Sequence, residues 1–197
     1  MQDRRGAPPQ PSDELGTGLL ATARRVGHLA WFERRCFEWL GAWSTVPVDP
    51  PVTVLLGEAA ARHGWHAEVL VARLPELREV DRGSLVVPPD GAAEAFLRAV
   101  TVDPDPGSVL DALVGQYRVL LPTLIGAYRR VLEGASPVAD GSLARWVRMI
   151  LDDDLDEWCR GDDLLRGLLR DEASVARAAE RQRELESLLL GSPFPNI

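Results

Sequence analysis

The sequence predicts an all-α protein whose centre is a four-helix bundle, followed by a C-terminal fifth helix. Apolar residues recur at three- and four-residue spacing through four long segments, which is the period of an amphipathic helix. Clusters of Pro, Gly, Asp and Ser separate these segments, and such clusters form turns. We therefore expect a strand content close to zero.

The expected helices divide the 197-residue chain into three parts. Residues 1–14 are rich in Pro, Gln and charge, a composition typical of disorder. Residues 15–170 are expected to form the bundle, and residues 171–197 the fifth helix and a tail. The bundle helices are predicted at residues 15–43, 51–75, 108–132 and 142–169, and the fifth helix at 172–190.

Loop lengths predict how the four helices connect. Short turns place the first helix antiparallel to the second, and the third antiparallel to the fourth. The connection between the two hairpins, residues 76–107, is long enough to run the length of the bundle and carries a short helix near residues 92–100. Pro122 lies inside the third helix and should kink it, because proline lacks a backbone donor and crowds the preceding turn.

The composition excludes several classes of protein. A net charge of −8 and scattered basic residues, all of them arginine, argue against a nucleic-acid-binding surface. No apolar stretch reaches the length of a membrane span, and the N-terminus lacks the apolar centre of a signal peptide. Cys36 and Cys159 lie in helical apolar patterns and do not make a disulfide framework. We expect a cytoplasmic protein that binds neither nucleic acid nor a membrane.

Ionisable side chains interrupt the apolar inner face of three of the predicted helices. Glu33 falls on this face in the first helix, and His63 and His66, one turn apart, fall on it in the second. In the fourth helix, Asp154 and Glu157 follow the apolar residues, again three residues apart. Burial of such groups is unfavourable unless they are paired or bind a ligand, so they are candidates for a functional site.

The candidate residues are expected at similar depths in the bundle. At about 1.5 Å per residue, Glu33 lies roughly 15 Å before the first hairpin loop and His63 about 18 Å after it. In the second hairpin, Tyr117 lies about 25 Å before the loop and Glu157 about 24 Å after it. The third helix carries no carboxylate at this depth and offers Tyr117 instead.

The arrangement resembles the ferritin-like superfamily, which includes ferritins, rubrerythrins and di-iron oxygenases. The usual pattern there is one Glu from each of two helices and Glu-x-x-His from each of the other two. The resemblance covers about residues 15–170, with a partial match to the motif. The matching residues, in chain order, are Glu33, the pair His63-Gly-Trp-His66, Tyr117 near the place of the second lone Glu, and the pair Asp154-Leu-Asp-Glu157.

The departures from this pattern change the site that the resemblance implies. His63 stands in place of a Glu, Glu157 stands in place of a His, and the third helix supplies no carboxylate. A complete di-iron centre is therefore not expected. The resemblance instead implies a mononuclear or degenerate metal site held by Glu33, the two histidines, and Asp154 or Glu157. Two imidazoles and a carboxylate suit non-haem iron, and also suit zinc or manganese.

With iron, the resemblance implies an oxidoreductase that uses oxygen on a small or carrier-bound substrate. Tyr117 is then the candidate catalytic residue, as a hydrogen-bond donor beside the metal. The alternative is a metal-free bundle that acts as a binding or scaffold module for a partner protein, with Glu33 ion-paired to Arg62 or Arg118. The number of large aromatic residues also fits a homodimer.

Overall fold

The computed structural model describes residues 11–76, 78, 80–191 and 194, with side chains from residue 18 onward. Helices make up most of these residues, and none of the described residues forms a β-strand, which confirms the predicted all-α class. The elements are, in order, α1 (Pro11–Trp43), α2 (Pro50–Arg73), the 3₁₀ turn η1 (Arg82–Leu85), α3 (Gly91–Val100), the 3₁₀ turn η2 (Pro106–Ser108), α4 (Val109–Val114), the π-helical η3 (Gly115–Leu120), α5 (Leu121–Gly134), α6 (Gly141–Leu168) and α7 (Glu172–Leu189).

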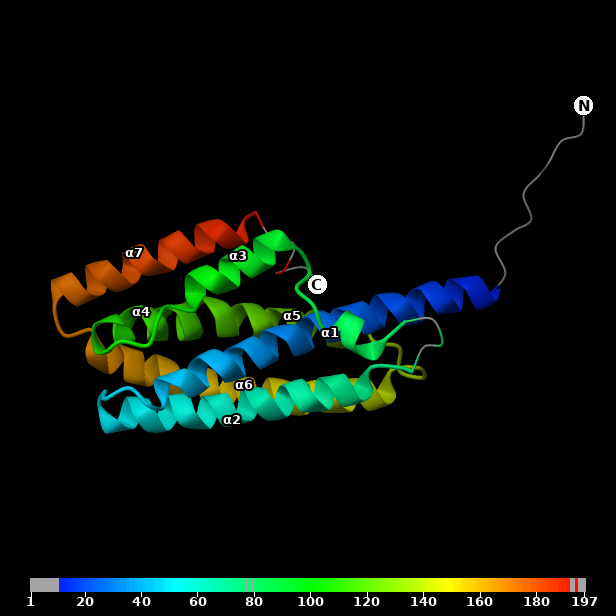
Figure 1. Ribbon diagram of the computed structural model, residues 1–197, viewed down its shortest axis with the longest axis horizontal. Helices are drawn as coiled ribbons and strands as arrows, with labels where there is room; N and C mark the ends of the chain where they lie inside the picture. The colour runs from blue at the N-terminus through cyan, green and yellow to red at the C-terminus, as the bar shows by residue number, and fades with distance from the viewer. Residues whose placement is uncertain (1–10, 77, 79, 192–193, 195–197) are drawn as a thin grey trace, which may run out of the picture.

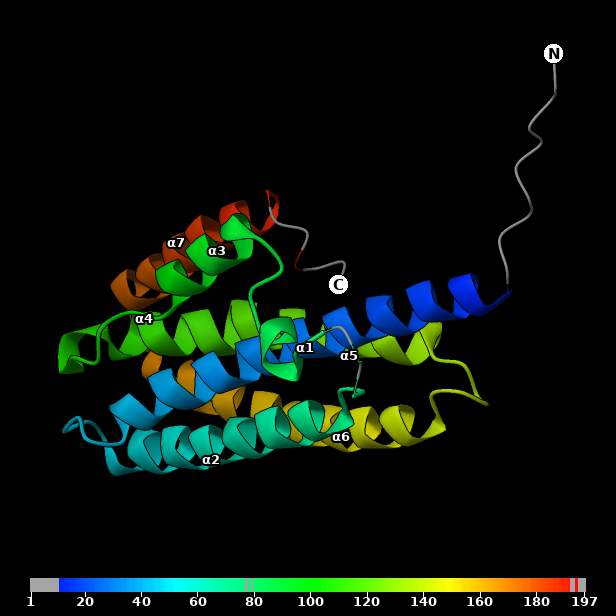
Figure 2. The same ribbon diagram turned by 45° about the vertical axis from the view of Figure 1, so that its right-hand side comes forward.

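Four long helical segments lie side by side, with α3 and α7 together on one side of them (Figure 1). These segments are α1, α2, the continuous run from α4 through η3 to α5, and α6. The first two run antiparallel, as do the last two, and α2 also packs against α6. The connection through η1 and α3 returns the chain from the end of α2 to the opposite end of the bundle, where α4 begins (Figure 2). The site described below lies where these four segments meet.

Helix starts follow local capping signals. Pro50 and Pro51 occupy the first turn of α2, where a missing N–H leaves no hydrogen bond unmade. The carboxylate of Asp90 accepts a hydrogen bond from the backbone N–H of Ala93 at the start of α3. At the other end of the chain, Asp171 and Ser174 form a reciprocal capping box that begins α7. The first helix begins at Pro11 rather than at Leu15, and residues 1–10 of the predicted disordered segment lie outside the described residues.

The third long segment changes its hydrogen-bond pattern just before Pro122. The N–H of Leu121 bonds to the carbonyl oxygen of Gln116, five residues back, so that η3 is a π-helical turn between two α-helices. The indole nitrogen of Trp158 on α6 donates to the main-chain carbonyl of Tyr117 at 2.9 Å. The adjacent residues Gln116 and Tyr117 in η3 are both fully buried.

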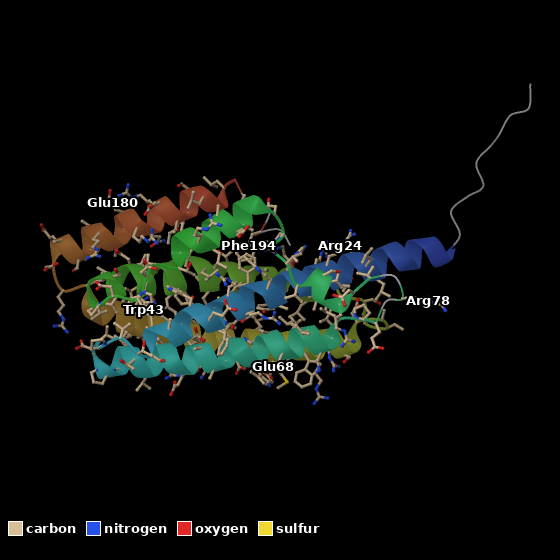
Figure 3. The ribbon with its side chains drawn as sticks, viewed as in Figure 1. Arg24, Trp43, Glu68, Arg78, Glu180 and Phe194 are labelled. Carbon is tan, nitrogen blue, oxygen red and sulfur yellow. The ribbon has the colours of Figure 1, made fainter. Side chains whose placement is uncertain are left out.

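The crossover connection is packed closely onto α1. A Cβ atom at Gly27 would lie only 2.1 Å from the carbonyl oxygen of Leu85, so any larger residue there would displace η1. Phe194, labelled in Figure 3, lies near the C-terminal end of the chain. Its ring stacks on Phe32 of α1 at 3.8 Å and lies 6.0 Å from Phe96 of α3. These contacts extend the core from the four long helices to α3 and the end of the chain.

One helical stretch, Pro106–Gly134, is long and apolar enough to cross a membrane by length and composition alone. However, 61% of its most apolar part is buried within the protein, and the core helix of a soluble protein passes the same test.

Candidate metal centre

Four ionisable side chains from three helices meet in the centre of the bundle. They are Glu33 on α1, His63 and His66 on α2, and Asp154 on α6, and each has an exposed fraction of 0%. One possible ligand atom from each residue lies within 4.8 Å of the others. Two imidazole nitrogens and two carboxylate oxygens at this spacing are a donor set that can hold a divalent transition metal.

Glu33 lies between both histidines and a tyrosine. Its Oε2 atom is 2.5 Å from Nδ1 of His63 and 3.5 Å from Nδ1 of His66. Its other oxygen, Oε1, accepts a hydrogen bond of 2.5 Å from the hydroxyl of Tyr128 on α5. The alternative ion pairs of Glu33 are not formed, because Arg62 pairs with Asp156 and Arg118 with Asp162.

The two ring nitrogens of His66 face different surroundings. Nδ1 has no hydrogen-bond partner among the residues that the structure describes, and it lies 3.5 Å from Oε2 of Glu33 and 3.6 Å from Oδ1 of Asp154. Nε2 lies 3.3 Å from Oδ2 of Asp153. Since a carboxylate only accepts, Nε2 carries the proton of this hydrogen bond and a neutral His66 presents a lone pair at Nδ1.

Several buried oxygens at the site have no hydrogen-bond partner among the described residues. Both carboxylate oxygens of Asp154 and Oε2 of Glu157 are in this position. A buried polar atom left unsatisfied costs about 1–3 kcal/mol, and more when it is charged. The oxygens of Asp154 lie within the four-residue cluster, so a cation bound there would satisfy them.

The outer nitrogen of His63 faces a second set of polar groups. Nε2 of His63 is 3.5 Å from Oε1 of Glu157 and 3.1 Å from the side-chain nitrogen of Gln116, which itself lies 3.4 Å from Oε1 of Glu157. Glu157, a predicted metal ligand, is therefore beside His63 but outside the four-residue cluster. Gln116 was not among the predicted site residues, because the apolar spacing of this helix indicates only Tyr117 as an inward residue.

The two buried tyrosines of the bundle, Tyr117 and Tyr128, have different surroundings. The ring of Tyr117 packs against the backbone of Gly161 on α6, and its hydroxyl, the predicted donor at the metal, has no partner among the described residues. The tyrosine that hydrogen-bonds a cluster residue is Tyr128. Its position between the inner-face residues Leu124 and Val131 is the sequence signal that could have identified it.

The close approach of opposite charges shifts the pKa values of the cluster. Burial is the largest influence on Glu33 and raises its pKa, but His63 and His66 together outweigh burial and hold that pKa well below its usual range. Burial alone would lower the pKa of each imidazole, yet the carboxylate of Glu33 raises both above the ordinary value. Burial, with the nearby charge of Glu33, raises the pKa of Asp154. Without a metal, His63, His66 and Asp154 therefore hold their protons more tightly than free side chains do.

Cys36 lies near the same cluster and takes no part in it as a nucleophile. Its side chain is fully buried and free, and burial raises the pKa of the thiol to about 12. The thiolate, which is the reactive form, is therefore scarce at neutral pH.

No protein-family profile matches this chain, and no curated protein or solved structure matches it either.

Proposed function

We propose that this chain is a metal-dependent oxidoreductase on a ferritin-like four-helix bundle, with one metal ion held by Glu33, His63, His66 and Asp154. The observation that carries the proposal is the state of Asp154. Its two carboxylate oxygens are buried and have no hydrogen-bond partner among the described residues, and one of them lies 3.6 Å from Nδ1 of His66. A bound cation gives these atoms the partner that the protein does not provide.

The donor set indicates the kind of metal. Two imidazoles with two carboxylates suit non-haem iron, and zinc or manganese accept the same donors. When bound, iron supplies the capacity to activate dioxygen. The ferritin-like assignment is supported by the path of the chain, since two antiparallel hairpins joined by one long crossover are the connectivity of that fold.

Residues of the chain itself would shape the reaction. Tyr128 orients Glu33 through its hydroxyl, and Gln116 and Glu157 contact the outer nitrogen of His63. Because all four proposed ligands have no exposed surface, bulk water is excluded from the centre. A reactant that reaches it without a movement of the helices must be of about the size of dioxygen or water, which favours a small substrate over a carrier-bound one.

Metal analysis of the purified protein tests the proposal. Protein from iron-supplemented cultures should contain close to one iron per chain, and this metal should be lost in Glu33→Ala and in His63→Ala. His28→Ala is the matched control, since His28 hydrogen-bonds the main-chain oxygen of Val87, outside the four-residue cluster, and its loss should leave the metal content unchanged. The iron-loaded protein, but not its metal-free form, should consume dioxygen when given a chemical reductant. Wild-type protein without bound metal would refute the proposal.

The alternative, a metal-free binding or scaffold module, has one observation in its favour. Glu33, His63 and Tyr128 form a buried hydrogen-bonded chain that needs no metal to satisfy the carboxylate of Glu33. A groove between α1 and α2, edged by the part-exposed rings of Phe37 and Trp65, would then be the partner surface. This reading requires that no metal co-purifies and that Glu33→Leu makes the protein more stable.

A further inference from the structure

Asp153 lies beside the proposed centre without belonging to the ligand cluster. Its Oδ2 atom accepts the hydrogen bond from Nε2 of His66 at 3.3 Å, on the side of the ring opposite to Glu33 and Asp154. Its side chain is 43% exposed, whereas the four cluster residues have no exposed surface. Asp153 thus contacts the imidazole of His66 from the surface of α6.

We infer that Asp153 is a positioning residue that fixes His66 in the form able to bind a metal. A neutral imidazole carries one proton, which must reside on either Nδ1 or Nε2. A carboxylate at Nε2 holds the proton there and leaves the lone pair at Nδ1, the nitrogen that faces the cluster. A carboxylate partner of this kind also makes the imidazole a stronger donor to the metal. This inference rests on the proposed metal centre.

The neighbouring contacts keep Asp153 in place. The guanidinium of Arg62 on α2 donates to the main-chain oxygen of Asp153 at 3.3 Å and pairs with Asp156 at 3.1 Å. Since Arg62 and His66 lie on the same helix, α2 contacts the backbone and the side chain of Asp153 at two points. The carboxylate is therefore held toward His66 although part of it is exposed.

The same helix provides a matched control residue. Asp152 carries the same charge one position earlier, is exposed, and has no hydrogen bond or ion pair with the described residues. A change at Asp152 therefore reproduces the loss of a surface charge near the site without the loss of the contact to His66.

The experiment measures the affinity of the full-length, metal-free protein for Zn²⁺ by competition with a chromophoric chelator. Asp153→Leu should weaken binding by about 10–100-fold, the usual effect of removing a residue that orients a metal ligand. Asp153→Asn keeps an oxygen that accepts the same hydrogen bond, so it should lose less affinity than Asp153→Leu. Asp152→Leu should bind like the wild type. The visible absorption of bound Co²⁺ should change in Asp153→Leu and not in Asp152→Leu, since only Asp153→Leu removes the hydrogen bond to the proposed ligand His66.

The outcomes separate this inference from the proposed function. If the wild type binds Zn²⁺ but Asp153→Leu binds it equally well, the role of Asp153 is refuted and the metal centre stands. An equal loss of Zn²⁺ affinity in Asp152→Leu would also refute the role of Asp153, because the loss would then come from the removal of a surface charge. Wild-type protein that binds no Zn²⁺ would refute both the role of Asp153 and the proposed metal centre. If Asp153→Leu does not fold, Asp153→Ser, whose side chain is too short for the contact, provides the same comparison.

Discussion

Oε2 of Glu33 lies 2.5 Å from Nδ1 of His63, and neither side chain has any exposed surface. In the metal-free protein these two groups stabilise each other as a buried ion pair, which raises the pKa of the imidazole and lowers that of the carboxyl group. A metal at the cluster must displace the proton between them. Glu33 and His63 thus form a structural ion pair in the metal-free protein and would be two of the ligands in the metal-bound protein.

Asp154 should reduce the stability of the metal-free protein. Asp154→Leu removes a buried carboxyl group whose oxygens have no hydrogen-bond partner among the described residues, and we expect the free energy of unfolding to rise by about 1–3 kcal/mol while metal binding is lost. The control is Asp162→Leu in the same helix, because Asp162 is also buried but is paired with Arg118 and Arg166. Because both arginines are partly exposed to solvent, that change should lower the free energy of unfolding by about 1–3 kcal/mol. Chemical denaturation measures both, and a destabilised Asp154→Leu protein would contradict the prediction.

The two buried tyrosines should respond differently to the loss of the hydroxyl group. Tyr128→Phe removes the hydrogen bond to the carboxylate of Glu33 and should destabilise the protein by about 1.5–3 kcal/mol. Tyr117→Phe removes a hydroxyl without a described partner and should change the stability by less than about 0.5 kcal/mol or raise it slightly. Thermal unfolding of the two variants gives the comparison. An equal loss of stability in the two variants would mean that the hydroxyl of Tyr117 also has a hydrogen-bond partner.

Gly161 should be required for the packing of Tyr117. A Cβ atom there would lie 2.3 Å from Cδ1 of the Tyr117 ring, so Gly161→Ala must displace the ring or α6. We expect a loss of about 1–3 kcal/mol from overpacking. Gly57→Ala is the control, because nothing lies within 4 Å of a Cβ atom at that helical position. It should instead gain about 0.5–1 kcal/mol from the higher helix propensity of alanine. A stabilised Gly161→Ala protein would show that this contact is absent.

Metal affinity should increase with pH. Although burial lowers the pKa of His63 and His66, the nearby carboxylates raise it above the ordinary value, so both imidazoles hold a proton more tightly than a free histidine does. A metal binds only the deprotonated nitrogen, so protons compete with it below the raised pKa. Affinity for Zn²⁺ should therefore rise from about pH 6 to about pH 8. Calorimetry in two buffers of different ionisation enthalpy should show proton release, and binding without proton release would contradict the assignment of ligands.

The helices could be predicted because their ends depend on local signals. The helix expected at residues 142–169 is α6 at Gly141–Leu168, and the one expected at 172–190 is α7 at Glu172–Leu189. Glu33 and the two histidines could be placed in the interior for a similar reason, since the 3.6-residue period of an α-helix fixes which side chains share a face. The packing of Phe194 on Phe32 could not be predicted, because it joins residues far apart in the chain and no local pattern indicates it.

The third helix shows what an apolar period leaves open. Gln116 and Tyr117 are adjacent in the π-helical turn Gly115–Leu120, and both are fully buried. The spacing of Leu113, Tyr117 and Leu120 indicates an inner position for Tyr117, whereas no apolar spacing indicates the burial of a polar residue such as Gln116. Pro122 is the local signal of a disturbance, but it does not specify that the disturbance takes the form of a π turn. The contact of Gln116 with His63 joins two helices far apart in the chain, so no local pattern could predict it.

X-ray absorption spectroscopy of the Zn²⁺-loaded protein tests the central claim most directly, because it reports the atoms bound to the metal. We predict a first shell that contains two imidazole nitrogens at about 2.0–2.1 Å together with carboxylate oxygens, and the loss of one imidazole contribution in His66→Ala. A shell of oxygen atoms only, or a spectrum that His66→Ala leaves unchanged, would contradict the assignment of Glu33, His63, His66 and Asp154 as a metal site.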